Sequence, residues 1–210
     1  MDLYEAIFSR RDIRKFRGDP IPNEVLRRIL QAAHHAGSVG FMQPWDFIVI
    51  RDLEVRRKVK RIFETENAKA AQNYSGERRA LYDSLKLEGI LESPLNLCVA
   101  CDRARGGIVL GRSSILDTDL FSTCCAVQNL WLAARAEGIG VGWVSILDNA
   151  GLSTLLGLPL NAVPIAYLCL GYPDEFPRAP MLETVGWRQR LALEEVVHDN
   201  RYGQHSLLEL

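Results

Sequence analysis

The chain has 210 residues, 48% of them hydrophobic, so it is long and apolar enough to bury a core and should form one domain over residues 1–210. Its 25 Lys and Arg nearly balance its 26 Asp and Glu, which argues against nucleic acid as a partner. The five Cys are odd in number, no signal peptide is visible, and no apolar run could span a bilayer. We therefore expect a reduced, cytoplasmic protein without membrane contact.

The first quarter of the chain predicts two helices and a strand. Apolar residues at helical spacing indicate a short helix over residues 2–10. A second helix should follow the glycine and proline breakers, with Asn23 as its N-cap. The sequence SVGFMQPW, residues 38–45, then predicts a loop that leads into a strand over residues 46–50.

The middle of the chain alternates between charged and apolar segments. Residues 53–72 predict a charged helix, and residues 76–88 are polar and amphipathic after a glycine break, as a lid would be. The near-continuous apolar run over residues 95–102 predicts a strand that is buried on both faces.

The last third predicts the longest and most apolar helix, over residues 118–138, with Gly138 at its end. Two further strands are expected over residues 140–146 and 162–173. Helices and strands interleave, but the chain opens with two helices and its crossovers are uneven. We therefore expect a layered α+β sandwich instead of a regular doubly wound sheet.

Three motifs that suggest metal or phosphate binding are better interpreted as structure. Cys98 and Cys101 are three residues apart in a strand, so they point to opposite faces and cannot share a metal ion. GGIVLGRS resembles a phosphate-binding loop with Arg112 in place of Lys, but it does not join a strand to a helix. The glycines of EGIGVGW lie between helix and strand, the reverse of a dinucleotide fingerprint, and indicate a helix stop and a sharp strand entry.

The stretch SRRDIRKF is the most informative, because four cations surround Asp12. In an extended chain Arg10, Asp12 and Arg14 share one side. Two guanidinium groups beside a carboxylate suit a phosphate or the polar edge of a heteroaromatic ring. A solvated basic turn explains the same charges equally well. A second pair of arginines, Arg188 and Arg190, favours the binding interpretation.

Several strings, in chain order, resemble the nitroreductase-type flavoproteins. They are YEAIFSRRDIRKF, SVGFMQPWDF, AVQNLWLAARAEGIGVGWVSI, LGYP and WRQRL. The resemblance runs over nearly the whole chain. It implies a nitroreductase-like α+β sandwich, with a mixed β-sheet flanked by helices. It also implies an intertwined homodimer with two FMN sites at the interface and no metal.

The same resemblance implies which residues hold FMN. They are Arg10, Arg11, Asp12, Ile13, Arg14, Ser38, Val39, Met42, Trp143, Ser145, Arg188 and Arg190. Arg10 and the two tail arginines would bind the phosphate, and Arg14 would lie at the pyrimidine edge of the flavin. Residues 38–42 would come from the partner subunit, residues 143–145 would pass near N5, and residues 76–88 would form the lid.

Two positions depart from the ordinary family pattern: Asp12 replaces a small polar residue, and Phe41 replaces an Asn. The pair of Asp12 and Ser145 resembles the branch that breaks down reduced FMN with O2 to 5,6-dimethylbenzimidazole and erythrose 4-phosphate. Asp12 and Ser145 would then be catalytic, with Asp12 moving protons. A separate flavin reductase would supply the reduced FMN. Two alternatives stay open: a conventional NAD(P)H-dependent FMN nitroreductase or flavin reductase, and a flavin-binding protein without catalysis.

Overall fold

A four-stranded β-sheet forms the centre of the computed structural model, which describes residues 1–204. In the order in which they pair, its strands are β1 (Trp45–Ile50), β2 (Leu95–Asp102), β4 (Ala162–Gly171) and β3 (Gly140–Val144). All three strand pairs are antiparallel. Among the described residues, the single isolated bridge is parallel and joins Asp12 to Val141. The four paired strands thus form an antiparallel sheet, whereas the prediction was a mixed sheet.

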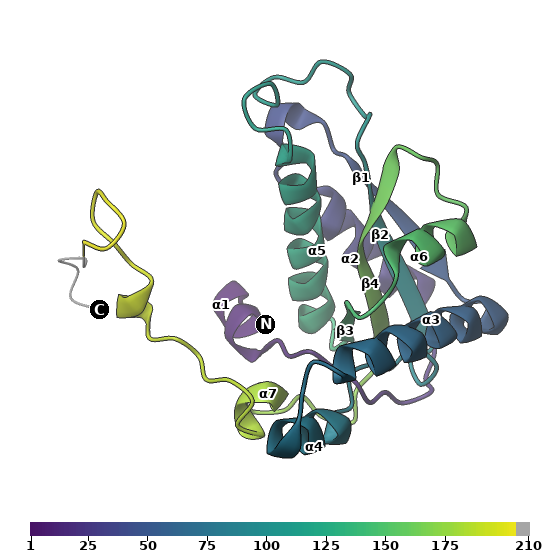
Figure 1. Cartoon of the computed structure of the whole chain (residues 1–210). Helices are drawn as coiled ribbons and strands as arrows, with labels where there is room; N and C mark the ends of the chain where they lie inside the picture. Colours follow the sequence, from purple (N-terminus) through teal and green to yellow (C-terminus); the bar gives the residue numbers. More distant parts are fainter. Residues whose placement is uncertain (205–210) are drawn as a thin grey trace. The chain divides into compact units, whose positions relative to one another are not determined.

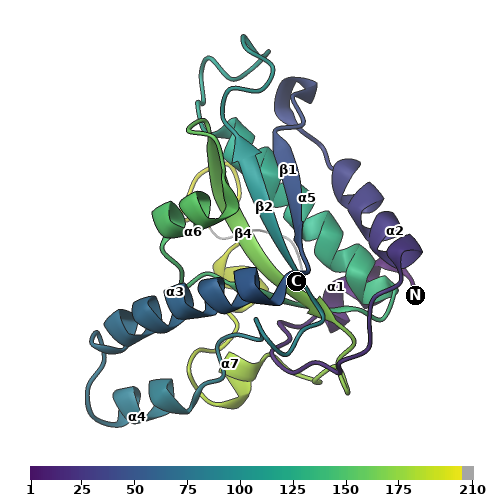
Figure 2. The same ribbon diagram turned by 90° about the vertical axis from the view of Figure 1, so that its right-hand side faces the viewer.

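Helices cover both faces of this sheet, which confirms the α+β sandwich (Figures 1 and 2). One face carries α2 (Asn23–His34) and α5 (Thr118–Ala136), and the other carries α3 (Leu53–Ala71) and α6 (Asn149–Leu156). The shorter helices are α1 (Leu3–Ser9), which packs on α5, and α4 (Gly76–Ser84), which packs on α3.

Each face of the sheet has its own apolar core. Ile29, Leu97 and Leu130 are fully buried between the sheet and α2 and α5. Val59 and Cys98 are fully buried on the side of α3 and α6. Full burial of one such aliphatic side chain contributes about 1.5–3 kcal/mol. Strand β2 lies between the two cores and is buried along almost its whole length, which confirms the prediction from its apolar run.

Two local predictions are wrong in detail. Asn23 is the first residue of α2 and not its cap, because Pro22 takes the N-cap position and the Asn23 side chain accepts a hydrogen bond from Arg51 at 3.1 Å. Strand β3 ends at Val144, so Ser145 follows the strand. The helix stop is confirmed, because Gly138 has a φ of +73°, which glycine adopts without strain.

The chain divides into two compact units, Met1–Phe176 and Pro177–Leu210. The described part of the second unit contains α7 (Met181–Thr184) and a 3-10 turn, η2 (Leu193–Glu195). Whether both units act as one domain stays a prediction. In the part of the chain that the structure describes, no helix is both long and apolar enough to cross a membrane.

Candidate functional site

The stretch that holds Asp12 runs beside β3 at the edge of the sheet. The Ile13 N–H donates to the Val141 carbonyl at 2.9 Å, and the Ile13 side chain is 4% exposed. This contact keeps residues 12–14 extended, as the alternation argument assumed. It therefore places neighbouring side chains on opposite sides, with Ile13 inward.

Two glycines of β3 allow this close approach. A Cβ at Gly142 would lie 2.1 Å from the Ile13 carbonyl oxygen and 2.7 Å from an Arg14 nitrogen. A Cβ at Gly140 would lie 2.8 Å from the Ile13 side chain. All three distances are far inside van der Waals contact. The sequence EGIGVGW by itself indicates only a helix stop and a strand entry. The structure shows a further role for Gly140 and Gly142: without side chains, they let the backbone of residues 12–14 lie close against β3.

Asp12 and Arg14 are joined side by side above Trp143. The Arg14 guanidinium donates to both carboxylate oxygens of Asp12 and to the Trp143 carbonyl at 3.0 Å. The Trp143 N–H donates to Asp12 Oδ1 at 2.9 Å. The prediction that Asp12 and Arg14 lie on one side of an extended stretch is thereby confirmed.

This pair has groups left over for a ligand. Within residues 1–204, Arg14 Nε is buried and finds no hydrogen-bond partner. Such an orphaned donor is costly unless an acceptor from a ligand meets it. The Asp12 side chain is 45% exposed, so its carboxylate is accessible to a bound molecule. A flavin, whose pyrimidine edge carries acceptors, fits this donor and carboxylate.

Trp131 of α5 supports the start of the same stretch, and sequence reasoning did not identify it. Its indole N–H donates to the Arg11 carbonyl at 3.3 Å. The Arg10 guanidinium lies over its ring, 4.8 Å from the ring centroid. The Arg11 guanidinium turns back to the Phe8 carbonyl at 2.8 Å, at the end of α1. Arg11 therefore caps a helix here, and its contact with FMN stays a prediction.

Ser145 lies just beyond the point where Asp12 is held. It is exposed and comes two residues after Trp143, which is about 7 Å along an extended chain. With Trp143 and Leu152 it lines a cavity of about 170 Å³ beneath α6. The structure does not record a contact between Ser145 and Asp12, so the predicted pairing stays a prediction.

The SVGFMQPW loop lies elsewhere on the same unit. The Val39 N–H donates to Ser122 Oγ near the start of α5 at 3.2 Å, and the Gln43 N–H donates to Ser38 Oγ at 3.1 Å. Phe41 and Gln43 have φ values of +54° and +47°, in the left-handed region that non-glycine residues rarely adopt. Backbone strain of this kind is typical of functional loops.

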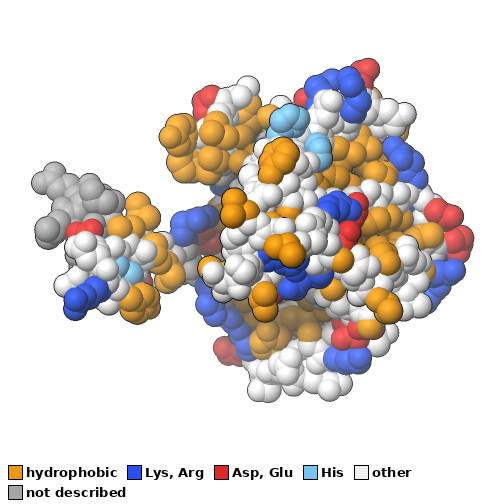
Figure 3. Space-filling view, turned by 90° about the horizontal axis from the view of Figure 1, so that it is seen from above, with side chains coloured by type: hydrophobic (Ala, Val, Ile, Leu, Met, Phe, Trp, Pro, Cys, Tyr) orange, Lys and Arg blue, Asp and Glu red, His pale blue; other side chains and the backbone are white. Residues whose placement is uncertain are grey.

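One chain therefore does not bring all the predicted residues together. Val39 contacts α5 at Ser122, and Arg10 contacts it at Trp131. These helix positions are nine residues apart, about 14 Å along the axis. Phe41 is 83% exposed, whereas Met42 is buried. Figure 3 shows the molecule from the side on which α5 begins, and there hydrophobic side chains lie on the surface between charged ones.

The predicted lid is a helix followed by an anchor. In α4 the Tyr82 hydroxyl donates to Asn67 of α3 at 2.6 Å. Glu88 is buried, pairs with Lys60 at 2.6 Å, and accepts from the Ile90 N–H. The next residue, Gly89, lies so close to Arg14 that a Cβ there would be 3.0 Å from the Arg14 carbonyl. The lid segment thus ends beside the candidate site, and its closure stays a prediction.

The tail arginines belong to the second unit. Arg188 and Arg190 follow α7 and line a pocket with Leu182 and Val196. Their predicted contact with a phosphate stays a prediction.

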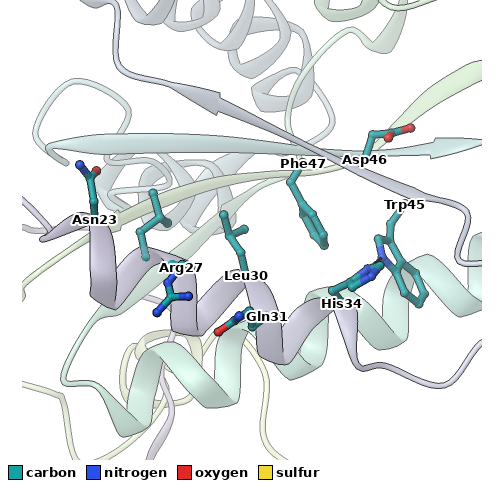
Figure 4. A pocket seen from close by; sticks show the side chains of 9 residues that line it. Asn23, Arg27, Leu30, Gln31, His34, Trp45, Asp46 and Phe47 are labelled. Carbon is teal, nitrogen blue, oxygen red and sulfur yellow. Dashed lines mark hydrogen bonds between the residues drawn. The ribbon is translucent and has the colours of Figure 1, made fainter.

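A separate groove of about 440 Å³ lies between α2 and β1 (Figure 4). Trp45 Nε1 donates to His34 Nδ1 at its end, at 3.1 Å. None of the predicted site residues is among those that line it.

The cysteines of the sheet lie where the strand argument placed them. Cys98 belongs to the core on the side of α3 and α6, whereas Cys101 approaches Thr123 of α5. Burial raises the pKa of the Cys98 and Cys169 thiols to about 12, so both are protonated at neutral pH and poor nucleophiles. Among residues 1–204, no group of three or more His, Cys, Asp or Glu could hold a metal ion.

Comparison with known proteins gives this site a context. Residues 7–172 match the nitroreductase family. The chain is 44% identical over 191 residues to a Rhodospirillum rubrum protein named 5,6-dimethylbenzimidazole synthase, with 90% of each chain covered. A Rhodobacter capsulatus protein of the same name is 39% identical, over 91% of this chain and 93% of its own.

Among solved structures, oxidized iodotyrosine deiodinase bound to FMN and 3-iodo-L-tyrosine matches with a TM-score of 0.73. The match covers 91% of this chain and 97% of that one, at 23% identity. At that identity the likeness shows a shared fold.

Proposed function

The chain belongs to the nitroreductase family, and from this premise we propose that it is a 5,6-dimethylbenzimidazole synthase. It takes reduced FMN as substrate and O2 as co-substrate, and releases 5,6-dimethylbenzimidazole, erythrose 4-phosphate and the oxygenated pyrimidine part of the flavin as a third fragment. The observation that carries the proposal is the likeness, over nine-tenths of both chains, to a protein of that name. The clamped carboxylate of Asp12 supports it, because breaking the ribityl chain requires proton transfers.

We assign FMN as the ligand of the polar groups that have no partner or are exposed at the site. Arg14 Nε and the Asp12 carboxylate would meet the flavin, and the edge of the Arg10 guanidinium would meet its phosphate. When bound, FMN supplies the redox chemistry with O2. The chain's own residues orient it and move protons, with Asp12 as the proton carrier and Ser145 as a hydrogen-bond partner.

We propose a homodimer because the predicted FMN contacts lie on two separate parts of one chain. Ser38, Val39 and Met42 would reach the flavin held by residues 10–14 of the partner subunit. Exposed apolar side chains on α1 and α5 support this assembly, since a second copy would bury them. They are Leu3, Tyr4, Ile7, Phe8 and Phe121.

A direct test is to mix the protein with reduced FMN in air and to analyse the products by mass spectrometry. We expect 5,6-dimethylbenzimidazole and erythrose 4-phosphate in equal amounts. If all the flavin returns as intact FMN and the O2 becomes peroxide, as happens when reduced FMN meets O2 without an enzyme, the proposal fails. A separate flavin reductase must supply new reduced FMN for each turnover in the cytoplasm, where we place the protein.

Replacing Arg10 with Ala should weaken FMN binding far more than riboflavin binding, because only FMN carries the phosphate. A charged hydrogen bond contributes roughly 1.5–3 kcal/mol, so we expect about a 10- to 100-fold selective loss. The double change Arg188→Ala with Arg190→Ala should act in the same direction. Fluorescence titration of both flavins measures the effect, with exposed Lys15→Ala as the control. Equal losses for both flavins would remove these arginines from the phosphate site.

The bound, oxidized FMN should be reduced poorly by NADPH, in contrast to a conventional nitroreductase. Each turnover consumes the flavin, so the enzyme needs new reduced FMN and no nicotinamide site. The lid and Phe41 would also cover the flavin face on which a nicotinamide must stack. In anaerobic stopped-flow absorbance, bleaching should be slower than about 1 per second, the lower end of ordinary turnover numbers. Faster bleaching would favour the conventional NAD(P)H-dependent reductase.

A further inference from the structure

Trp131 touches the candidate site in three ways although it belongs to a core helix. Its indole N–H donates to the Arg11 carbonyl at 3.3 Å. Its ring face carries the Arg10 guanidinium, 4.8 Å from the centroid. Its ring centroid is 6.3 Å from that of Trp143, whose backbone binds Asp12 and Arg14. One side chain thus connects both ends of the 10–14 stretch.

Arg10 needs such a support. Its backbone ends α1 with an N–H bond to the Ala6 carbonyl at 3.0 Å, and its φ and ψ of −62° and 143° are already extended. Beyond that point a long Arg side chain has many rotamers, and most of them point its charge into water. Contact with the indole selects those rotamers that keep the guanidinium over one ring face.

Stacking leaves the useful part of the guanidinium unoccupied. A cation–π contact uses the flat face of the group, whereas its N–H donors project from the edge in the same plane. That edge matches two oxygens of a phosphate. Trp131 therefore holds Arg10 in place without competing for its hydrogen bonds, which an acidic partner would do.

A residue that only filled the core would not need these features. Trp131 and its neighbour Leu130 both belong to the apolar core between the sheet and helices α2 and α5. Leu130 is fully buried in this core, and Trp131 is 8% exposed. A Phe or Leu at position 131 would serve that cluster. The indole N–H is instead used on a carbonyl between Arg10 and Asp12.

We infer that Trp131 is a positioning residue for the phosphate subsite: it orients the Arg10 guanidinium and so sets the preference for FMN over riboflavin. This inference rests on the proposed function, which assigns the phosphate to Arg10. The consequence is a selectivity determinant on α5 that need not touch the ligand itself.

The experiment measures dissociation constants of FMN and riboflavin for the full-length protein by flavin fluorescence, and takes their ratio. Trp131→Leu removes the ring face and should lower the preference for FMN about 10-fold, the scale of a partly desolvated cation–π contact. Trp131→Phe keeps a ring face and should lower it only about 2- to 3-fold. In an Arg10→Ala background, adding either change should alter the ratio less than 2-fold.

Leu130→Ala is the matched control, because it damages the same core next to Trp131. It should lower the midpoint of thermal unfolding and leave the ratio unchanged. If Trp131→Leu does not fold, Trp131→Phe with and without Arg10→Ala decides the question by the same ratio.

Two results would overturn the inference, and they are distinguishable. If the Trp131 changes weaken both flavins equally, or shift the ratio just as much without Arg10, then Trp131 is only structural while the phosphate assignment stands. If Arg10→Ala alone leaves the ratio unchanged, then the assignment of the phosphate to Arg10 fails, and the inference fails with it.

Discussion

Replacing Asp12 with Asn should reduce 5,6-dimethylbenzimidazole formation at least about 100-fold, the lower end of what a general acid or base contributes. The amide keeps the size of the side chain and can still accept from the Trp143 N–H, which lies 2.9 Å from Asp12 Oδ1. It cannot take a proton as the carboxylate does. Its NH2 group would take the place of Asp12 Oδ2, which accepts from the Arg14 guanidinium, so two hydrogen-bond donors would face each other.

The measurement is the rate of product release from reduced FMN in air, with FMN affinity determined in parallel. Asp19→Asn is the control, because Asp19 is an exposed acid that pairs with Arg17 at 3.3 Å. We expect Asp12→Asn to keep most FMN binding, since the other contacts remain. A wild-type rate in this variant would exclude Asp12 as the proton carrier.

Replacing Gly142 with Ala should weaken FMN binding by more than about 100-fold. The new methyl group would meet the Ile13 carbonyl at 2.1 Å and an Arg14 nitrogen at 2.7 Å. The stretch that carries Asp12 and Arg14 must then leave β3, and overpacking of this kind costs about 1–3 kcal/mol. Both the free energy of unfolding and flavin affinity should fall.

Gly37→Ala provides the comparison, because a Cβ there meets nothing within 4 Å. It should bind FMN as the wild type does. Flavin titration and thermal unfolding of both variants separate a local effect from a general one. Wild-type affinity in Gly142→Ala would show that the site does not depend on the contact between residues 12–14 and β3.

Most of the fold could be predicted from local patterns. The apolar run of residues 95–102 became β2 with the predicted ends, and the long helix ended at Ala136, two residues before the predicted stop signal Gly138. Helix α6 was missed although its signals were present: Asp148 accepts from the Gly151 N–H at 2.9 Å, and Gly157 ends the helix with a φ of +67°. Its eight residues are too short for periodicity to stand out.

The candidate site was predictable only where it is local in sequence. Alternation in an extended chain placed Asp12 beside Arg14, and the structure joins them. Trp131 and Gly142 join the same site through space, from positions more than 100 residues away, so no spacing rule pointed to them. Alternating small residues in a strand were a usable signal for close backbone approach.

The most direct measurement follows one carbon atom. FMN carrying ¹³C at the ribityl C1′ is reduced, mixed with the protein in air, and the products are analysed by NMR and mass spectrometry. If the chain fragments its flavin, the label appears at C2 of 5,6-dimethylbenzimidazole, and unlabelled erythrose 4-phosphate forms in equal amount. If the label stays entirely in intact FMN, which reduced FMN and O2 form even without an enzyme, the proposed reaction is wrong.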